Sequence, residues 1–171
     1  RGLGDVYKRQ ILYGNPDGSE AEMTEAATIA QATEFIEQKK KKYKSTISQG
    51  GSNVSGGQKQ RLSIARAIAK HPDVYIFDDS FSALDYKTDA TLRAKLKEKT
   101  SESTVMIVAQ RISTILHADQ IIVLDDGQIV GKGTHKELLK NCEAYYQIAS
   151  SQLSEKELEE DLKEVESYAK R

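Results

Sequence analysis

The sequence predicts an α/β fold in which helices alternate with strands of a parallel sheet. An amphipathic helical segment that begins after Ser55 precedes a short apolar run, Val74–Phe77, that ends in two aspartates. A helical segment near Lys87–Glu98 and two further apolar runs, Thr104–Ala109 and Gln120–Leu124, follow. Such alternation is typical of parallel strands that are connected by helices.

The composition argues against several functional classes. Lys and Arg together number 25 and Asp and Glu 26, so the net charge of −1 gives no electrostatic footprint for nucleic acid. The basic block Lys39–Lys42 is typical of a solvated helix face. The single cysteine, Cys142, excludes an intrachain disulfide, and no apolar run reaches membrane-spanning length, so we expect a soluble segment. His71, His117 and His135 are far apart in sequence and are predicted to be ordinary loop or surface residues rather than zinc ligands.

The segment before the amphipathic helix is predicted to be a helix followed by a loop. Residues from about Met23 to Lys42 carry apolar side chains at helical spacing, and Tyr43–Asn53 is predicted to be a loop. The next helix starts at Ser55-Gly56-Gly57, whose glycines allow close approach to the backbone and whose first N–H groups lack helical acceptors. A helix start of this kind suits an anion, although many solvent-exposed helix starts have the same local sequence.

The strand that follows is predicted to deliver carboxylates to the edge of the sheet. Asp78 and Asp79 come directly after the apolar run, and ligands of open α/β sheets bind at the carboxyl ends of strands. Turn-forming aspartates that only cap a strand are the structural alternative.

Two local patterns are expected nearer the C-terminus. Asp125-Asp126-Gly127 lies between the apolar runs Ile121–Leu124 and Gln128–Val130, which predicts a hairpin with a turn at positive φ. Thr134 followed three residues later by Glu137 predicts the N-cap of a helix.

Together these segments resemble the ATP-binding-cassette (ABC) ATPases. The run Asn53–Ala67 is similar to their signature motif, and very closely to that of ABC exporters. Val74–Asp79 is similar to a Walker B strand, and Ser82–Asp85 stands at the spacing of the D-loop. Gly133–Leu138 resembles the family's closing GTHxEL segment.

The resemblance sets the expected domain boundaries. It covers roughly residues 11–153 and implies an α/β, partial ABC-type P-loop NTPase fold, with a helical subdomain and signature helix over about 20–70 and a Walker B and switch core over about 71–140. Residues 1–10 depart from the family and are predicted to be a non-native leader outside the fold. Residues 154–171 are predicted to be a charged amphipathic tail that frays in solvent, with one apolar stripe of Leu158, Leu162, Val165 and Ala169.

The same resemblance implies a site shared by two subunits. In the family, two nucleotide-binding domains pair head to tail, and each ATP lies between the Walker residues of one and the signature motif of the other. Asp78 is expected to support Mg²⁺ through water, and Asp79 and Gln110 take the catalytic positions. The residues expected to bind the ATP of the partner site are Asn53, Ser55, Gly56, Gly57 and Gln58, with Asp85 in the D-loop at the interface.

Both catalytic positions depart from the family, which usually has a glutamate and a histidine there. Asp79 is one methylene shorter than glutamate and loses roughly 1.5 Å of reach, a C–C bond length. A misplacement of about 1 Å can cost on the order of 100-fold in rate. Gln110 forms hydrogen bonds but cannot carry a proton as histidine does. With an intact signature, the two departures resemble the degenerate-site subunit of a heterodimeric ABC exporter.

The sequence contains no Gly-x-x-x-x-Gly-Lys-Ser/Thr loop, and the family's A-loop and Q-loop are missing too. We therefore expect a fold without the P-loop strand and a fragment that is inactive as an ATPase on its own. The parent protein is expected to work at the cytoplasmic face of the cell membrane, where its own transmembrane domain contacts this domain through coupling helices. Three alternatives stay open: a homodimeric ABC transporter ATPase that hydrolyses with Asp79, a soluble ABC-type ATPase acting on nucleic acid or ribosomes, and a truncated, non-catalytic interaction module.

Overall fold

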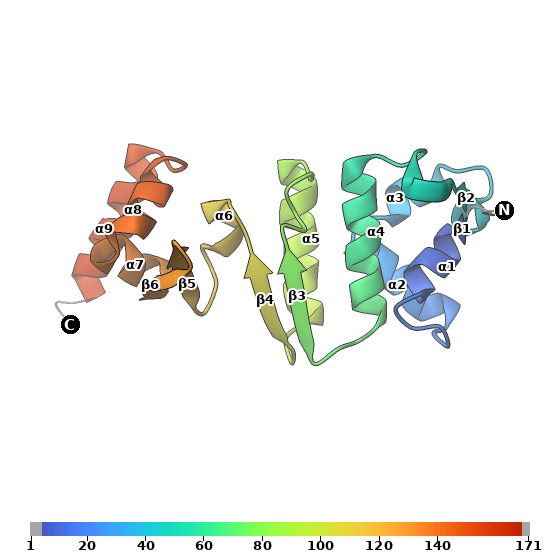
Figure 1. Ribbon diagram of the computed structural model, residues 1–171, viewed down its shortest axis with the longest axis horizontal. Coiled ribbons are helices and arrows are strands. Elements are labelled where there is room, and N and C mark those ends of the chain that lie inside the picture. The colour runs from blue at the N-terminus through green and yellow to red at the C-terminus, as the bar shows by residue number, and fades with distance from the viewer. Residues whose placement is uncertain (1–4, 169–171) are drawn as a thin grey trace. The chain divides into compact units, whose positions relative to one another are not determined.

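The computed structural model describes residues 5–168, with side chains described as far as residue 162, and divides into two compact units (Figure 1). The first unit ends at Val108 and the second begins at Ala109. The first contains β1 (Asp5–Val6), α1 (Tyr7–Leu12), α2 (Glu20–Ile29), α3 (Thr33–Glu37), the 3-10 turns η1 (Lys42–Lys44) and η2 (Gln49–Gly51), β2 (Thr46–Ile47), α4 (Gly56–Ala69), β3 (Val74–Asp78), α5 (Tyr86–Lys99) and β4 (Thr104–Val108). The second contains α6 (Ile112–Ile115), β5 (Ile121–Asp125), β6 (Gln128–Gly133), α7 (His135–Asn141), α8 (Glu143–Ser150) and α9 (Glu155–Tyr168).

The helical part of the first unit differs from the single helix predicted for about Met23 to Lys42. α2 ends at Ile29 because Gln31 takes the left-handed conformation, with φ +57°. The N–H of Ala32 donates to the carbonyl oxygen of Ala27 at 2.7 Å, and the N–H of Gln31 donates to that of Thr28 at 3.2 Å. These two bonds satisfy the last carbonyls of the helix in a Schellman ending, so the chain turns before α3.

The parallel pairing predicted for the sheet is confirmed for β3 and β4, with Val74 opposite Thr104 and Asp78 opposite Val108. Tyr75 and Phe77 point into the core formed with α4 and α5, where their side chains are 4% and 2% exposed. The described residues of the first unit leave the opposite face of the two strands uncovered. Its exposed apolar side chains are Val74, Ile76, Met106 and Val108.

Residues 5–10 are part of the first unit, contrary to the prediction that residues 1–10 lie outside the fold. β1 pairs antiparallel with β2, and the side chain of Tyr7 is completely buried with its ring against Phe35. Arg66 of α4 donates from Nε to the carbonyl oxygen of Gln10 at 2.9 Å. The segment folds because it supplies a buried aromatic side chain to the core and a backbone acceptor to Arg66 of α4. Residues 1–4 lie outside the described residues, and the origin of the segment stays a prediction.

The second unit is built on the predicted hairpin. β5 and β6 pair antiparallel with a bulge at Val123/Leu124, and the turn has φ +47° at Asp126 and +75° at Gly127, which confirms the prediction. The predicted N-cap is also confirmed, because Thr134 and Glu137 form a capping box at the start of α7.

The C-terminal tail is docked rather than frayed over the part that the structure describes. α9 packs against α7 and α8, and the side chain of Leu158 is 7% exposed in a core that includes Ile112 and Leu138. His135, predicted to be an ordinary loop or surface residue, is 4% exposed: its Nδ1 lies 2.7 Å from the Tyr145 hydroxyl and its Nε2 lies 3.1 Å from Asp161 Oδ2. The side chain of Val165 and residue Ala169, both assigned to the tail's apolar stripe, lie outside the described residues.

Candidate nucleotide-binding and catalytic site

The start of α4 is a capping box that leaves two backbone donors open. Ser55 Oγ accepts from the N–H of Gln58 at 3.3 Å, and Gln58 Oε1 accepts from the N–H of Ser55 at 3.1 Å. The N–H groups of Gly56 and Gly57 have no acceptor among the residues that the structure describes. Two unsatisfied N–H groups at the positive end of a 14-residue helix are the kind of donors that suit an anion, and the predicted contact with nucleotide stays a prediction.

The two glycines have different surroundings. A β-carbon added to Gly56 would meet only Ala83 Cβ, at 3.9 Å, which is ordinary contact. A β-carbon added to Gly57 would lie 2.8 Å from the carbonyl oxygen of Ala83, which is too close. Gly57 is therefore required for packing within this chain, whereas the outer side of Gly56 is open to another molecule.

Asn53 has a structural task in the loop before α4. Its Oδ1 accepts from the N–H of Ser48 at 2.9 Å, and its Nδ2 donates to the carbonyl oxygen of Thr46 at 3.0 Å. Both ends of the amide are thus used to brace the loop that leads into the signature. The predicted contact of Asn53 with nucleotide stays a prediction.

Asp78 and Asp79 lie side by side in sequence at the carboxyl end of β3, and both are exposed. Asp79 has φ +46°, and its N–H donates to the carbonyl oxygen of Val108 at 3.1 Å, which continues the pairing of β3 with β4 by one residue. No group of three or more His, Cys, Asp or Glu side chains within the described ranges is arranged to hold a metal alone. A single exposed carboxylate is nevertheless what Mg²⁺ uses when substrate phosphates and water supply its other ligands.

Asp85 is the N-cap of α5. Its Oδ1 accepts from the N–H of Thr88 at 3.0 Å, and the hydrogen bonds from Thr88 hold the pKa of the Asp85 carboxyl below its usual value. The cap fixes where the D-loop ends and α5 begins, and the carboxylate remains exposed.

Gln110 belongs to the second unit, and its side chain is exposed. Gln152, in the turn after α8, holds its backbone: Nε2 of Gln152 donates to the carbonyl oxygen of Gln110 at 2.9 Å, and Oε1 accepts from the N–H of Ile112 at 2.9 Å. Gln152 is not among the residues predicted from the sequence. No local signal marks it, because its two partners are 42 and 40 residues away in sequence.

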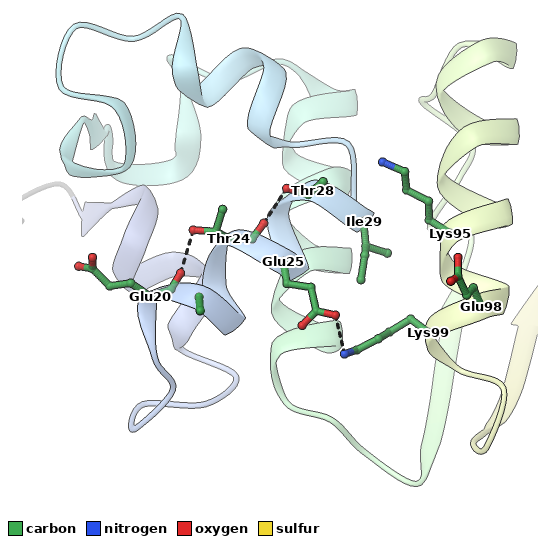
Figure 2. Close-up of a pocket in the computed structure, with 9 residues that line it drawn as sticks. Glu20, Thr24, Glu25, Thr28, Ile29, Lys95, Glu98 and Lys99 are labelled. Carbon is green, nitrogen blue, oxygen red and sulfur yellow. Dashed lines mark hydrogen bonds and ion pairs between the residues drawn. The ribbon is translucent and has the colours of Figure 1, made fainter.

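A groove of about 860 Å³ lies between α2 and α5 of the first unit (Figure 2). Glu25 and Lys99 face each other across it and form an ion pair at 2.7 Å, with Lys95 further along α5. Its walls contain both charge signs and none of the predicted site residues. The groove therefore does not coincide with the start of α4 or the end of β3, where the sequence predicts the nucleotide contacts.

Known proteins share these segments. The ABC transporter family matches residues 6–82, including part of the segment that the sequence analysis left out of the fold. An uncharacterised ABC transporter ATP-binding protein of Mycobacterium tuberculosis is 48% identical over 151 residues, which are 87% of this chain and 26% of the relative. A candidate multidrug export ATP-binding/permease protein of Staphylococcus aureus is 41% identical over 150 residues, covering 88% of this chain and 26% of the relative.

The same similarity is found among solved structures. The structure of a bacterial Atm1-family ABC exporter with ATP bound matches with a TM-score of 0.84 and 33% identity, over 90% of this chain and 27% of that chain. The chain thus spans about a quarter of the length of the proteins that it matches.

Proposed function

We propose that this chain, whose residues 6–82 match the ABC transporter family, forms part of the ATP-binding domain of an exporter. Its signature motif would complete the ATP site of a second nucleotide-binding domain. Its own Walker B site would be the weaker of the two. The relatives are named ATP-binding proteins or ATP-binding/permease proteins, which agrees with an ATP-binding domain attached to a membrane domain.

The open donors at the start of α4 carry this proposal. The N–H groups of Gly56 and Gly57 point out of the helix, and the space beside Gly56 is free of close neighbours. Phosphoryl transfer is catalysed mainly by positioning and by donors aimed at the charge on the phosphate oxygens. Ser55 adds a hydroxyl whose proton is not used by the capping box, because the oxygen is the acceptor from Gln58.

The end of β3 would serve this chain's own nucleotide. The exposed carboxylate of Asp78 suits a water-mediated contact with Mg²⁺, and ATP phosphates would complete the metal's ligands. Asp79 would orient the attacking water from a shorter side chain than glutamate provides, and Gln110 would supply a hydrogen bond but no proton. This pairing of weak catalytic groups with an intact signature favours a heterodimer with a different subunit.

The transmembrane partner belongs to the rest of the parent protein. Across residues 5–168, no helix combines the length and the apolar character that a bilayer crossing requires. We propose that this domain lies on the cytoplasmic face of the membrane and that its helical subdomain contacts coupling helices of the parent's transmembrane part. No nucleic-acid partner is proposed, since the net charge is −1.

The test is Gly56→Asp in the full-length transporter assembled with its partner. A carboxylate beside the open N–H groups would occupy and repel the phosphate site, while the fold tolerates a side chain there. We expect most ATP turnover to be lost while nucleotide binding to this subunit's own Walker site persists. Ser52→Asp adds the same charge at an exposed position of the preceding loop and should leave turnover unchanged. Turnover that survives Gly56→Asp would show that the start of α4 does not complete a catalytic site.

The isolated chain gives a second check. Because its sequence contains no phosphate-binding P-loop, the purified chain of residues 1–171 should show no more Mg-ATP turnover than the same chain carrying Gly56→Asp. Measurable turnover above that level would contradict the shared-site arrangement, because this chain would then bind and hydrolyse nucleotide by itself.

A further inference from the structure

Gln60, one turn into α4, forms a bridge to the segment that follows β3. Its Nε2 donates to the carbonyl oxygen of Asp79 at 3.1 Å and to Ser82 Oγ at 3.0 Å. Its Oε1 accepts from the N–H of Ala83 at 2.9 Å. One amide side chain thus binds three successive points of the loop between β3 and α5.

The residue at the near end of this loop has an uncommon backbone conformation. Asp79 is not glycine, yet its φ is +46°, a region that disfavours side chains with a β-carbon by roughly 1–2 kcal/mol. Its N–H is held by Val108 and its carbonyl oxygen by Gln60 Nε2 and Ser82 Oγ. Such a conformation persists only when its surroundings fix it. Gln60 therefore helps to set the direction in which the Asp79 carboxylate leaves the strand.

Gln60 also connects this loop to the signature motif at the start of α4. Gln60 stands on the same continuous helix as Gly56 and Gly57, and Gly57 itself packs against the carbonyl oxygen of Ala83. A displacement of the first turn of α4 must therefore move the loop from Asp79 to Ala83, or break the hydrogen bonds of Gln60.

We propose that Gln60 is a positioning residue that couples the two ATP sites of the assembled transporter. It joins the donors that serve the partner's nucleotide, at the start of α4, to the backbone of Asp79, which serves this chain's own nucleotide. The inference rests on the proposed function and adds to it a route between the sites. Glutamine suits the task because one amide supplies both a donor and an acceptor.

Gln60→Glu tests the bridge with almost no change of shape. The variant keeps the acceptor for the N–H of Ala83 but places a carboxylate against the carbonyl oxygen of Asp79, so the bond to Asp79 is lost. Gln38→Glu, at an exposed position after α3, introduces the same charge elsewhere in the first unit and is the matched control. Gln60→Met removes all three side-chain hydrogen bonds without adding charge, and so controls for an effect of charge alone.

The measurement is made on the full-length transporter with its partner. Turnover at the partner's site is measured twice, once with this subunit's own site empty and once with it filled by a non-hydrolysable nucleotide. The ratio of the two turnover rates is the coupling factor. Coupling between sites typically amounts to about 5–150-fold, and we expect Gln60→Glu and Gln60→Met to lower the factor at least about fivefold, towards one. Gln38→Glu should leave it unchanged.

The outcomes separate this inference from the proposed function. If Gly56→Asp abolishes turnover while both Gln60 variants keep the wild-type coupling factor and melting temperature, Gln60 does not couple the sites and only this inference fails. If both Gln60 variants lower total turnover and melting temperature but leave the factor unchanged, the residue is merely structural and the inference also fails. If Gly56→Asp leaves turnover intact, the proposed function itself fails.

Discussion

Gly57 lies so close to the carbonyl oxygen of Ala83 that a β-carbon added to Gly57 would come within 2.8 Å of that oxygen. The neighbouring Gly56 has no such neighbour closer than 3.9 Å. The two adjacent glycines of this motif therefore differ: a side chain at Gly57 would clash with Ala83, whereas the outer side of Gly56 is open to another molecule.

Gly57→Ala should destabilise the protein, whereas Gly56→Ala should not. Forcing a methyl group against a backbone carbonyl costs about 1–3 kcal/mol, which exceeds the roughly 1 kcal/mol that alanine gains over glycine in a helix. At Gly56, where no atom closer than 3.9 Å opposes a methyl group, the change should be neutral or stabilise the protein by at most about 1 kcal/mol. Urea unfolding of both variants measures the difference, and equal stabilities would show that the approach of Ala83 does not constrain Gly57.

The double variant Asp79→Glu with Gln110→His should increase hydrolysis at this subunit's own site. Glutamate restores about 1.5 Å of reach, and histidine restores a group that can carry a proton. The assay uses the full-length heterodimer with the partner's own catalytic glutamate disabled. An unchanged turnover would remove the support for a degenerate site, and each single variant shows which departure matters more.

Leu158→Ala should release α9 from the second unit. A buried leucine in such a core contributes about 2–5 kcal/mol, and the side chain of Leu158 is 7% exposed. Glu160→Ala removes only an exposed partner of Lys156 on the same helix and should change stability by less than about 0.5 kcal/mol. Amide hydrogen exchange of α9 gives the readout. Equally high protection in Leu158→Ala would show that docking does not depend on Leu158, and low protection in the wild type would support the frayed-tail prediction.

Stability of the second unit should fall at alkaline pH through Tyr145. Burial, with Asp161 nearby, raises the pKa of Tyr145 from 10.0 to about 12. Because the folded-state pKa is the higher one, the contribution is complete below about pH 10 and is lost as the pH rises towards about 12. Tyr145→Phe should flatten this loss, at the cost of about 1 kcal/mol for the hydrogen bond to His135. Tyr86→Phe, at an exposed tyrosine, should leave the pH profile of unfolding as in the wild type.

The isolated chain should be poorly soluble because of the uncovered face of β3 and β4. Parallel sheets are normally covered on both faces, yet Ile76 is 67% and Met106 55% exposed. Replacing both with lysine should increase the soluble yield without altering the buried face. A monomeric wild-type chain with a sharp cooperative melt and dispersed amide resonances would contradict this expectation.

The local sequence determined those features whose causes lie within a few residues. The capping boxes at Ser55 and Thr134, the hairpin turn at Asp126-Gly127 and the strand that ends in Asp78 all follow from short-range hydrogen bonding and periodicity, so each could be predicted. The resemblance to ABC proteins rests on the same short segments.

Only the tertiary structure decided the features that depend on distant partners. Whether α9 docks depends on the cavity that α7 and α8 leave for Leu158, and the burial of His135 depends on Tyr145 and Asp161. The hydrogen bond from Gln60 to Asp79 joins residues 19 positions apart in sequence, and no periodic pattern in the sequence indicates it. Sequence patterns show which side chains and backbone groups each helix or strand carries. The contacts between these elements form only when the chain packs, and they fix the direction of Asp79 and the role of Gly57.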